Sequence, residues 1–324
     1  MPMAIVHMPF RSRRIWLAII AIPVILTGCG NAEATLPTPG ANADAVTSGA
    51  EQPDWTVVSN GLNVVLATPD LGLGEQRFAM VLSTREGLVR FPVVEFRSYF
   101  YPEGLDGRRE GPFQTELARF TEFPLGTRGI YVTSLEFNRQ GSWSVEVDVP
   151  QSDGSSASAE VQFAVNESPH SVAVGEKAPL SRNRTLSDVA SVRDLTTGSL
   201  YDEELYRLTI AEAVSRQQPL VVVFASPAFC TNAVCGPQVE VASELRARYA
   251  GQVNFIHVDL FENPREIQGD LNRAVETPLL REWGLVSQEW TYVLDSSGAV
   301  TARFENFVGV EELTEAIDRA IATG

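Results

Sequence analysis

The chain has 324 residues, of which 44% are hydrophobic, so it can build two ordinary domains with cores of their own. That apolar fraction excludes a chain that is disordered throughout. The formal net charge is −16 at pH 7, and the first 29 residues contribute only positive charge to it. So acidic a surface repels phosphate backbones and anionic lipid headgroups, which argues against nucleic acid as a partner and against a polybasic membrane contact.

The N-terminal segment has the order of a secretory signal. Arg11, Arg13 and Arg14 precede the apolar run 15–26, which is followed by small residues. This run holds 12 residues, fewer than the ~20 that a helix needs to span a bilayer, and Pro23 interrupts it. We therefore expect residues 1–29 to direct export rather than to remain as a membrane-spanning helix.

The segment ends in Leu26-Thr27-Gly28-Cys29, which resembles the bacterial lipobox. The resemblance implies a lipoprotein whose Cys29 thiol carries a lipid such as palmitate and anchors it at the extracytoplasmic face of the cell membrane. An ordinary signal peptide with an incidental cysteine is the other interpretation, and Sec and twin-arginine export both stay open. Residues 30–53 are small and polar without periodicity, so they are expected to form a flexible tether.

Residues 54–167 are predicted to form an all-β domain. Apolar and polar residues alternate along runs that turn-forming residues separate, with strands expected at 62–67, 77–83, 93–101, 129–137, 142–149 and 159–165. Strands of this length and spacing indicate an immunoglobulin-like sandwich. The region resembles small β-sandwich modules of bacterial extracytoplasmic proteins through Gly129-x-Tyr131 and Gly141-x-Trp143-x-Val145, and Trp143 is expected in its core.

The remaining chain divides into a weakly structured linker, 168–199, and an α/β domain, 200–324. Helices are predicted at 208–217, 236–249, 277–283 and 311–320. Strands are predicted at 220–225, 254–260, 290–294 and 300–304, the last two forming a hairpin. The continuous apolar run 220–225 is typical of a strand that is buried on both faces.

Two cysteines stand between a buried strand and a helix, in the motif Val-Phe-Ala-Ser-Pro-Ala-Phe-Cys-Thr-Asn-Ala-Val-Cys-Gly-Pro at 223–237. This motif and the element order resemble the thioredoxin-like superfamily, and the Phe-Cys-x4-Cys-Gly-Pro form resembles a group of bacterial extracytoplasmic members. The resemblance implies that Cys230 attacks and Cys235 resolves the mixed disulfide. It also implies extracytoplasmic protein or small-molecule thiols and disulfides as partners, and no cofactor.

The spacing of the two cysteines constrains any disulfide between them. Five positions along a continuous helix separate two Cα atoms by about 8.6 Å, beyond the ~7 Å limit for a bridge. The pair can close only if the segment from Cys230 to Cys235 is a loop, which Thr231-Asn232 and Gly236-Pro237 favour. An inert disulfide that only fixes this loop stays open as the other interpretation.

The chain departs in two ways from the pattern of the thioredoxin-like superfamily, and both departures favour the interpretation of an inert disulfide. Thioredoxin-like oxidoreductases have a cis-proline facing the cysteines, whereas this chain has Glu289 there, followed by Trp290, and we expect both to line the substrate groove. A cis bond before a residue other than proline costs ~2.5–4 kcal/mol, so a trans peptide is expected. The second departure is that Val221-Val222-Val223 lacks the family's buried acid, which would leave proton handling to water or to Glu289.

A metal site is another interpretation, because copper-delivery proteins of the Sco type share the thioredoxin-like fold and use two cysteines with a histidine. His257 lies in the middle of a predicted strand, where a hydrogen-bonded structural histidine is expected, so we predict no metal. The leading hypothesis is therefore a membrane-anchored thiol–disulfide oxidoreductase that acts through Cys230 and Cys235. The alternative is a non-catalytic binding or assembly lipoprotein with a structural disulfide.

Overall fold

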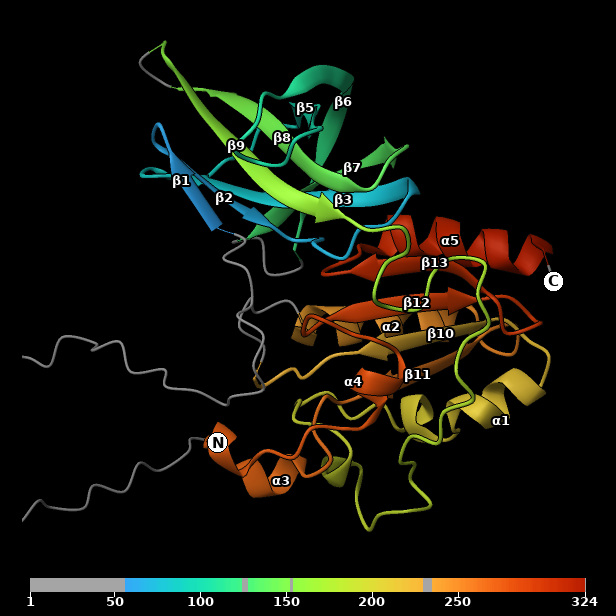
Figure 1. Cartoon of the computed structure of the whole chain (residues 1–324). Helices are drawn as coiled ribbons and strands as arrows, with labels where there is room; N and C mark the ends of the chain where they lie inside the picture. Colours follow the sequence, from blue (N-terminus) through green and yellow to red (C-terminus); the bar gives the residue numbers. More distant parts are fainter. Residues whose placement is uncertain (1–55, 124–127, 152–153, 230–234, 324) are drawn as a thin grey trace, which may run out of the picture. The chain divides into compact units, whose positions relative to one another are not determined.

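The computed structural model describes residues 56–123, 128–151, 154–229 and 235–323 (Figure 1). The predicted signal with Cys29, the predicted tether and Cys230 lie outside the described residues. Within these ranges, no helix is long and apolar enough to cross a membrane.

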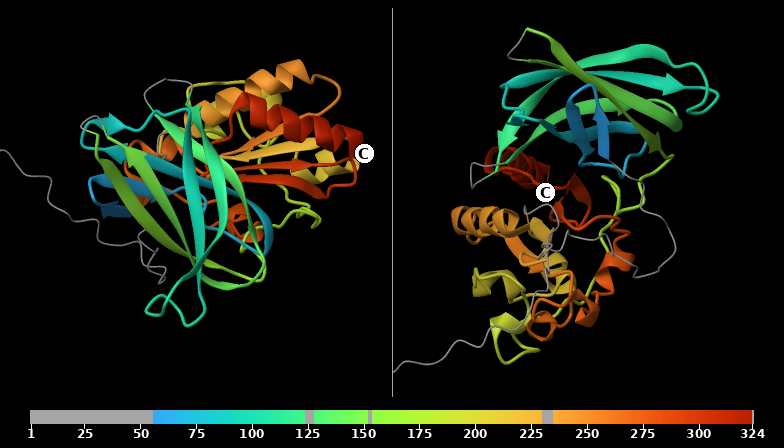
Figure 2. Two further views of the ribbon diagram at one scale, coloured as in Figure 1. Left: turned by 90° about the horizontal axis from the view of Figure 1, so that it is seen from above. Right: turned by 90° about the vertical axis from the view of Figure 1, so that its left-hand side faces the viewer.

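The first part of the described chain is a single antiparallel sheet. Its order is β1-β2-β3-β7-β6-β5-β8-β9, with β4 paired to β3. The two terminal strands of this order contact each other, and Asn60 Nδ2 donates to Ser158 Oγ across them at 3.4 Å. The sheet therefore curls into a barrel-like β domain (Figure 2). Its strands are β1 (Thr56–Ser59), β2 (Leu62–Leu66), β3 (Gly74–Thr84), β4 (Gly87–Leu88), β5 (Val93–Tyr101), β6 (Glu110–Glu122), β7 (Gly129–Phe137), β8 (Gly141–Pro150) and β9 (Ser156–Val165).

This arrangement corrects the expected immunoglobulin-like sandwich. A sandwich has two separate sheets, whereas these strands are hydrogen-bonded into one. All six predicted strands exist, but β1, β4 and β6 were missed. Strand β6 contains Gly111 and Pro112, and most of its side chains are exposed, so the alternation that identifies a strand is absent from it. Trp143 is buried in the barrel core as predicted, against the rings of Phe100 and Phe137.

The second part is a four-stranded sheet with helices on both faces. The strand order is β11-β10-β12-β13, in which β10 and β11 are parallel and the other pairs antiparallel. This is the strand, helix, strand, helix, hairpin, helix order predicted from the sequence, with a short α3 added. The elements are α1 (Ile210–Ser215), β10 (Leu220–Phe224), α2 (Cys235–Arg248), β11 (Asn254–Val258), α3 (Pro264–Ile267), α4 (Leu279–Glu282), β12 (Trp290–Leu294), β13 (Val300–Glu305) and α5 (Val310–Thr323), with 3-10 helices at Val192–Asp194, Glu203–Tyr206 and Leu271–Arg273.

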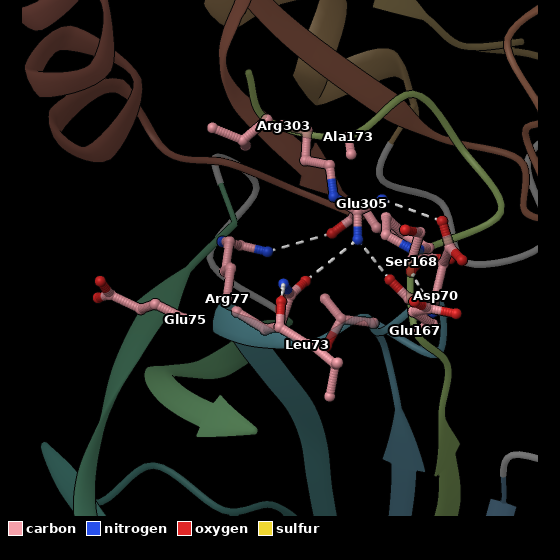
Figure 3. A pocket seen from close by; sticks show the side chains of 13 residues that line it. Asp70, Leu73, Glu75, Arg77, Glu167, Ser168, Ala173, Arg303 and Glu305 are labelled. Carbon is pink, nitrogen blue, oxygen red and sulfur yellow. Dashed lines mark hydrogen bonds and ion pairs between the residues drawn. The ribbon is translucent and has the colours of Figure 1, made fainter. Parts of the chain in front are cut away.

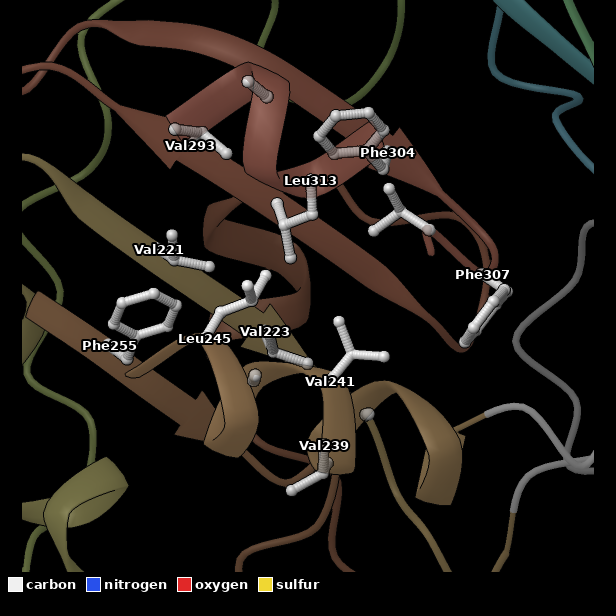
Figure 4. Close-up of a cluster of buried hydrophobic side chains, with 14 of the residues drawn as sticks. Val221, Val223, Val239, Val241, Leu245, Phe255, Val293, Phe304, Phe307 and Leu313 are labelled. Carbon is white, nitrogen blue, oxygen red and sulfur yellow. The ribbon is translucent and has the colours of Figure 1, made fainter. Parts of the chain in front are cut away.

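Strand β10 shows why this sheet has a core on each face. All five of its residues are buried, and successive side chains point to opposite sides. Val221 and Val223 enter the cluster formed with α2 and α5 (Figure 4). Val222 and Phe224 enter a second cluster that contains Trp283. The apolar run that predicted this strand from sequence is thus explained by helices covering both of its faces.

The segment 168–199 is irregular, as expected, but it is packed into the fold. Its buried residues are Ser171, Ala178, Ser181, Asn183, Thr185, Leu195 and Thr196. Lys177 forms an isolated antiparallel bridge with Ala299, which ties the segment to the β12–β13 hairpin. The side-chain oxygen of Asn183 accepts from the backbone N–H of Ile210 at 2.8 Å and so fixes the start of α1. The segment therefore belongs structurally to the α/β domain.

Asp70 joins the β domain, this segment and β13. Its carboxylate accepts from the backbone N–H groups of His170 and Ser171, from the Ser171 hydroxyl at 2.7 Å and from Arg303 Nη1 at 2.9 Å. Its own N–H donates to Glu305 Oε2 at 3.0 Å. Burial raises the pKa of Asp70, but these donors and the Arg303 charge outweigh burial and hold the pKa below its usual range.

We predict that Asp70→Asn lowers the free energy of unfolding at pH 7 by about 3 kcal/mol, because it leaves the buried Arg303 charge without its partner. The folded-state pKa of Asp70 is lowered, so its contribution is complete above the unfolded-state pKa of about 4 and is lost as the pH falls from there through the lower folded-state pKa. Denaturant unfolding between pH 2.5 and pH 7 would show the two curves converging at the acidic end.

The control is Glu122→Gln, which breaks the exposed ion pair of Arg90 with Glu122 and should cost less than about 1 kcal/mol. An equal cost for Asp70→Asn would contradict the structural role of the buried pair.

Candidate functional site

Cys235 is the first residue of α2 and is fully buried. Its Sγ lies 3.7 Å from the carbonyl oxygen of Gln288, in the segment that enters β12. The side chain belongs to the same apolar cluster as Phe307 and Val308. Cys235 is disulfide-bonded. When it is reduced, the N-terminus of α2 favours a thiolate, whereas burial among apolar side chains disfavours it.

The peptide bond between Gln288 and Glu289 is trans, as predicted. The cis bond of the described residues is the one before Pro112, in the β domain. An ordinary trans peptide therefore stands where the resemblance to thioredoxin-like proteins implied a cis-proline, and the carbonyl of Gln288 faces the sulfur of Cys235.

The side chains of Glu289 and Trp290 do not line an open groove, contrary to expectation. They are 1% and 0% exposed. The backbone N–H of Asn306 donates to the carbonyl of Glu289 at 3.0 Å, which extends the β12–β13 pairing by one residue. Because this pairing draws the start of β12 into the sheet, the side chain of Glu289 is carried into the interior.

The carboxyl group of Glu289 is buried without hydrogen bonds. Neither of its carboxyl oxygens has a hydrogen-bond partner. Burial raises the pKa of Glu289 to about 8, with the charge of Arg77 acting in the opposite direction. The carboxyl group is therefore largely protonated at neutral pH in the folded chain.

Two further buried polar atoms, one on α2 and one on β12, lack hydrogen-bond partners. Gln238, one turn along α2 from Cys235, accepts from the N–H of Val308 at 2.9 Å, while its Nε2 has no partner. The hydroxyl of Thr291 is also buried without a partner. Buried polar groups are almost always hydrogen-bonded, so each of these unpartnered atoms is an exception to the rule.

Arg77 of β3 reaches this region from the β domain. It pairs with Glu312 of α5 at 2.7 Å, and its Nη1 and Nη2 donate to the carbonyl oxygens of Glu305 and Phe307 at 3.1 and 2.7 Å. Arg77, Asp70, Arg303 and Glu305 line a cavity of about 270 Å³ (Figure 3). Burial raises the pKa of Glu305 to about 8.

A second polar cluster fixes the chain between β10 and Cys230. Asp259, directly after β11, accepts from the N–H and the hydroxyl of Thr197 at 2.6 and 2.8 Å. The Thr197 hydroxyl in turn lies 3.0 Å from Ser226 Oγ and accepts from the N–H of Ala228 at 3.3 Å. Burial raises the pKa of Asp259 to about 6. Asp259 was not predicted as a site residue from the sequence, although it follows a strand whose carboxyl end lies at the same edge of the sheet as that of β10.

His257 is a structural histidine, as predicted. Its Nδ1 lies 2.7 Å from the Tyr206 hydroxyl and its Nε2 lies 2.9 Å from the Ala225 carbonyl, so both ring nitrogens are occupied. Burial lowers the pKa of His257 to about 4. In the described part of the chain, no three His, Cys, Asp or Glu side chains are grouped so that they could hold a metal ion.

No family of known proteins matches the chain, and neither does any curated protein. Among solved structures, one of Chlorobium tepidum described as a thiol:disulfide interchange protein, DsbE, is 15% identical, with a TM-score of 0.34 over 47% of this chain and 99% of its own. A thioredoxin family thiol:disulfide interchange protein of Chlorobium tepidum TLS is 13% identical, with a TM-score of 0.28 over 35% and 86%. MtrC of Shewanella baltica OS185 is 16% identical, with a TM-score of 0.25 over 38% and 24%. At these values the likeness gives no information about activity.

The raised pKa of Glu289 has a consequence for stability. Between about pH 4.5 and pH 8 the folded chain holds a proton on Glu289 that the unfolded chain has released, so the stability falls as the pH rises. Relative to Glu289→Gln, the wild type should lose about 1.4 kcal/mol per pH unit across this range. Unfolding curves that stay parallel for the two proteins would contradict the assignment of a buried, protonated Glu289.

Proposed function

We propose that this chain is an extracytoplasmic thiol–disulfide exchange protein whose redox pair is Cys230 and Cys235. The observation that carries the proposal is the place of Cys235, buried at the N-terminus of α2 and in contact with the segment that enters β12. Cys230 attacks a substrate disulfide, and Cys235 then resolves the mixed disulfide by forming the Cys230–Cys235 bond and releasing the substrate thiol.

Three features support this assignment. Cys235 is disulfide-bonded rather than a free thiol, and its partner lies outside the described residues. Cysteines at the N-terminus of a helix are typical of proteins that exchange disulfides, because the helix end favours the thiolate released on reduction. An acid with a raised pKa, Glu289, directly follows the residue that contacts the sulfur, and acids of this kind are common where protons are exchanged in catalysis.

We further propose that the chain is anchored through a lipid on Cys29, at the extracytoplasmic face of the membrane. The lipobox-like tetrapeptide and the apolar run before it support this placement. The partners would then be protein or small-molecule thiols and disulfides outside the cytoplasm. Incorporation of labelled palmitate should occur in the wild type and be lost in Cys29→Ala, and equal labelling of the two would contradict the anchor.

The exchange role predicts that Cys230→Ser and Cys235→Ser abolish turnover of glutathione disulfide, whereas Cys29→Ser leaves it intact because that cysteine takes no part. The reduction potential of the Cys230–Cys235 pair should lie above about −300 mV, in the range of exchanging rather than structural disulfides.

The alternative role gives a different pattern. A potential far below about −300 mV, with no exchange by the wild type, would identify a structural bridge. A cellular phenotype that survives both cysteine substitutions but not loss of the β domain would identify a non-catalytic binding or assembly lipoprotein.

A further inference from the structure

The cavity of about 270 Å³ is lined by three parts of the chain (Figure 3). The β domain contributes Asp70 and Arg77, the segment after β9 contributes Glu167, and β13 contributes Arg303 and Glu305. Small-molecule sites in proteins usually measure about 300–1,000 Å³. The cavity is therefore large enough for a small molecule or a single side chain, but not for a whole helix or strand of a partner.

The two arginines of the cavity are neutralised within the fold. Arg303 Nη1 donates to Asp70 Oδ2 at 2.9 Å, and its Nη2 donates to the Asp70 carbonyl and to Gln76 Oε1. Arg77 donates to both carboxylate oxygens of Glu312, at 2.7 and 3.0 Å. An anion could pair with either arginine only by displacing one of these carboxylates, so the lining does not favour an anionic ligand.

Three acids of the lining are not ion-paired within the described ranges. Glu75 and Glu167 are exposed, and Glu305 is buried. The arginines of the cavity form their ion pairs with Glu312 and Asp70 instead. The cavity therefore carries an excess of acids over available bases, in a chain whose net charge is already −16. Such a lining attracts a cation.

Glu305 has an acceptor that the fold does not use. The residue is 5% exposed, and its Oε2 accepts from the N–H of Asp70 at 3.0 Å. Its Oε1 is buried and has no hydrogen-bond partner. Buried polar atoms are almost always hydrogen-bonded, so an unpartnered carboxyl oxygen on a residue that lines a cavity indicates a ligand that donates to it.

The chemistry of the lining favours an organic cation over a metal ion. No three His, Cys, Asp or Glu side chains of the residues described are grouped so that they could hold a metal ion. A primary ammonium has three N–H donors and a guanidinium has five, so either can donate to a carboxylate and to neutral oxygens at once. Leu73 and Val174, which are 38% and 59% exposed, can pack against the methylene groups that carry such a cation.

We propose that this cavity binds an organic cation with a primary ammonium or guanidinium group, which donates to the carboxylate of Glu305 and is attracted by Glu75 and Glu167. The cation belongs either to a free small molecule or to a basic side chain of a partner protein. This binding is independent of thiol–disulfide exchange and goes beyond the proposed function. Because both domains line the cavity, the bound cation also stabilises the contact between them.

Glu305 makes the binding dependent on pH. Burial and the charge of Asp70 raise its pKa to about 8, although the Asp70 N–H, the Ser287 hydroxyl and Arg303 lower it. The other titratable groups on the surrounding elements are Glu75 and Arg77 of β3, Glu167 after β9 and Tyr292 of β12. A cation that needs the carboxylate displaces the proton that Glu305 holds below pH 8, so it binds more tightly as the pH rises towards 8.

Calorimetric titration of the full chain tests the proposal with three probes. Agmatine is a free molecule with both cationic groups, whereas Nα-acetyl-lysine methylamide and Nα-acetyl-arginine methylamide present one side chain each. All three stay cationic up to about pH 9. We expect the affinity to rise about tenfold from pH 6 to pH 7 and to level off above pH 8. Binding of agmatine alone identifies a free small molecule as the ligand, and binding of a blocked amino acid identifies a basic side chain of a partner protein.

Glu305→Gln should weaken binding at pH 8 at least about tenfold and remove its pH dependence. This variant resembles the protonated acid and keeps an oxygen for the N–H of Asp70, so it should fold. Glu167→Gln alters only an exposed side chain and should weaken binding about threefold while the pH dependence remains. Glu122→Gln, an acid of β6 that does not line the cavity, is the control and should bind as the wild type does.

Three results would overturn the inference. The first is that none of the three probes binds to the wild type at about 1 mM. The second is an affinity that does not rise between pH 6 and pH 8. The third is binding by Glu305→Gln that equals that of the wild type at pH 8. None of these results depends on the cysteines, so each leaves the proposed exchange function untouched.

Discussion

The burial of β12 on both faces is the constraint from which the character of the site follows. Its five residues are all buried, because α2 and α5 cover one face and the cluster around Trp283 covers the other. A strand that is covered on both faces also shields the residue next to its start from solvent. Glu289 stands at that beginning, paired to Asn306, and its carboxyl group is therefore desolvated and held protonated at neutral pH. The same packing brings the carbonyl of Gln288 against Cys235.

A buried carboxyl group without hydrogen bonds is costly to the fold, and Arg77 of the β domain is the cation that acts on it. Two arginines cross between the domains in opposite directions. Arg77 leaves β3 and binds the turn after β13, while Arg303 leaves β13 and binds Asp70 of the β domain. Both arginines are largely buried, and each forms an ion pair with a carboxylate. Separation of the two domains would therefore break both ion pairs and leave four charged groups without their partners. The two domains are thus coupled by the same groups that surround the candidate redox site.

Much of this architecture could be predicted from the sequence because it depends on local patterns. The run 220–225 specified β10, and the alternation of Ser142 to Val149 specified most of β8. Strand β6 could not be recognised, because Gly111, Pro112 and its exposed side chains remove the periodic signal. Closure of the β strands into one sheet rather than two depends on pairing between strands far apart in sequence, such as β3 with β7, which no local pattern records.

The candidate site, too, could be predicted only in part from the sequence. Cys235 and the trans peptide before Glu289 followed from motif and covalent geometry. The burial of Glu289 and Trp290 did not, because it depends on the pairing of Glu289 with Asn306 and on helices that pack from other parts of the chain. The contacts of Arg77 could not be predicted from the sequence either, because more than two hundred residues separate it from its partner Glu312.

The most direct test of this account is the infrared difference spectrum between the oxidised and reduced chain at pH 7. Isotope labelling of glutamate and the Glu289→Gln variant would assign the bands. A protonated carboxyl band that responds to the redox state of Cys235 and disappears in Glu289→Gln is the result predicted by a buried, protonated acid next to the residue that contacts the sulfur. A spectrum in which no carboxyl band responds to reduction would contradict it.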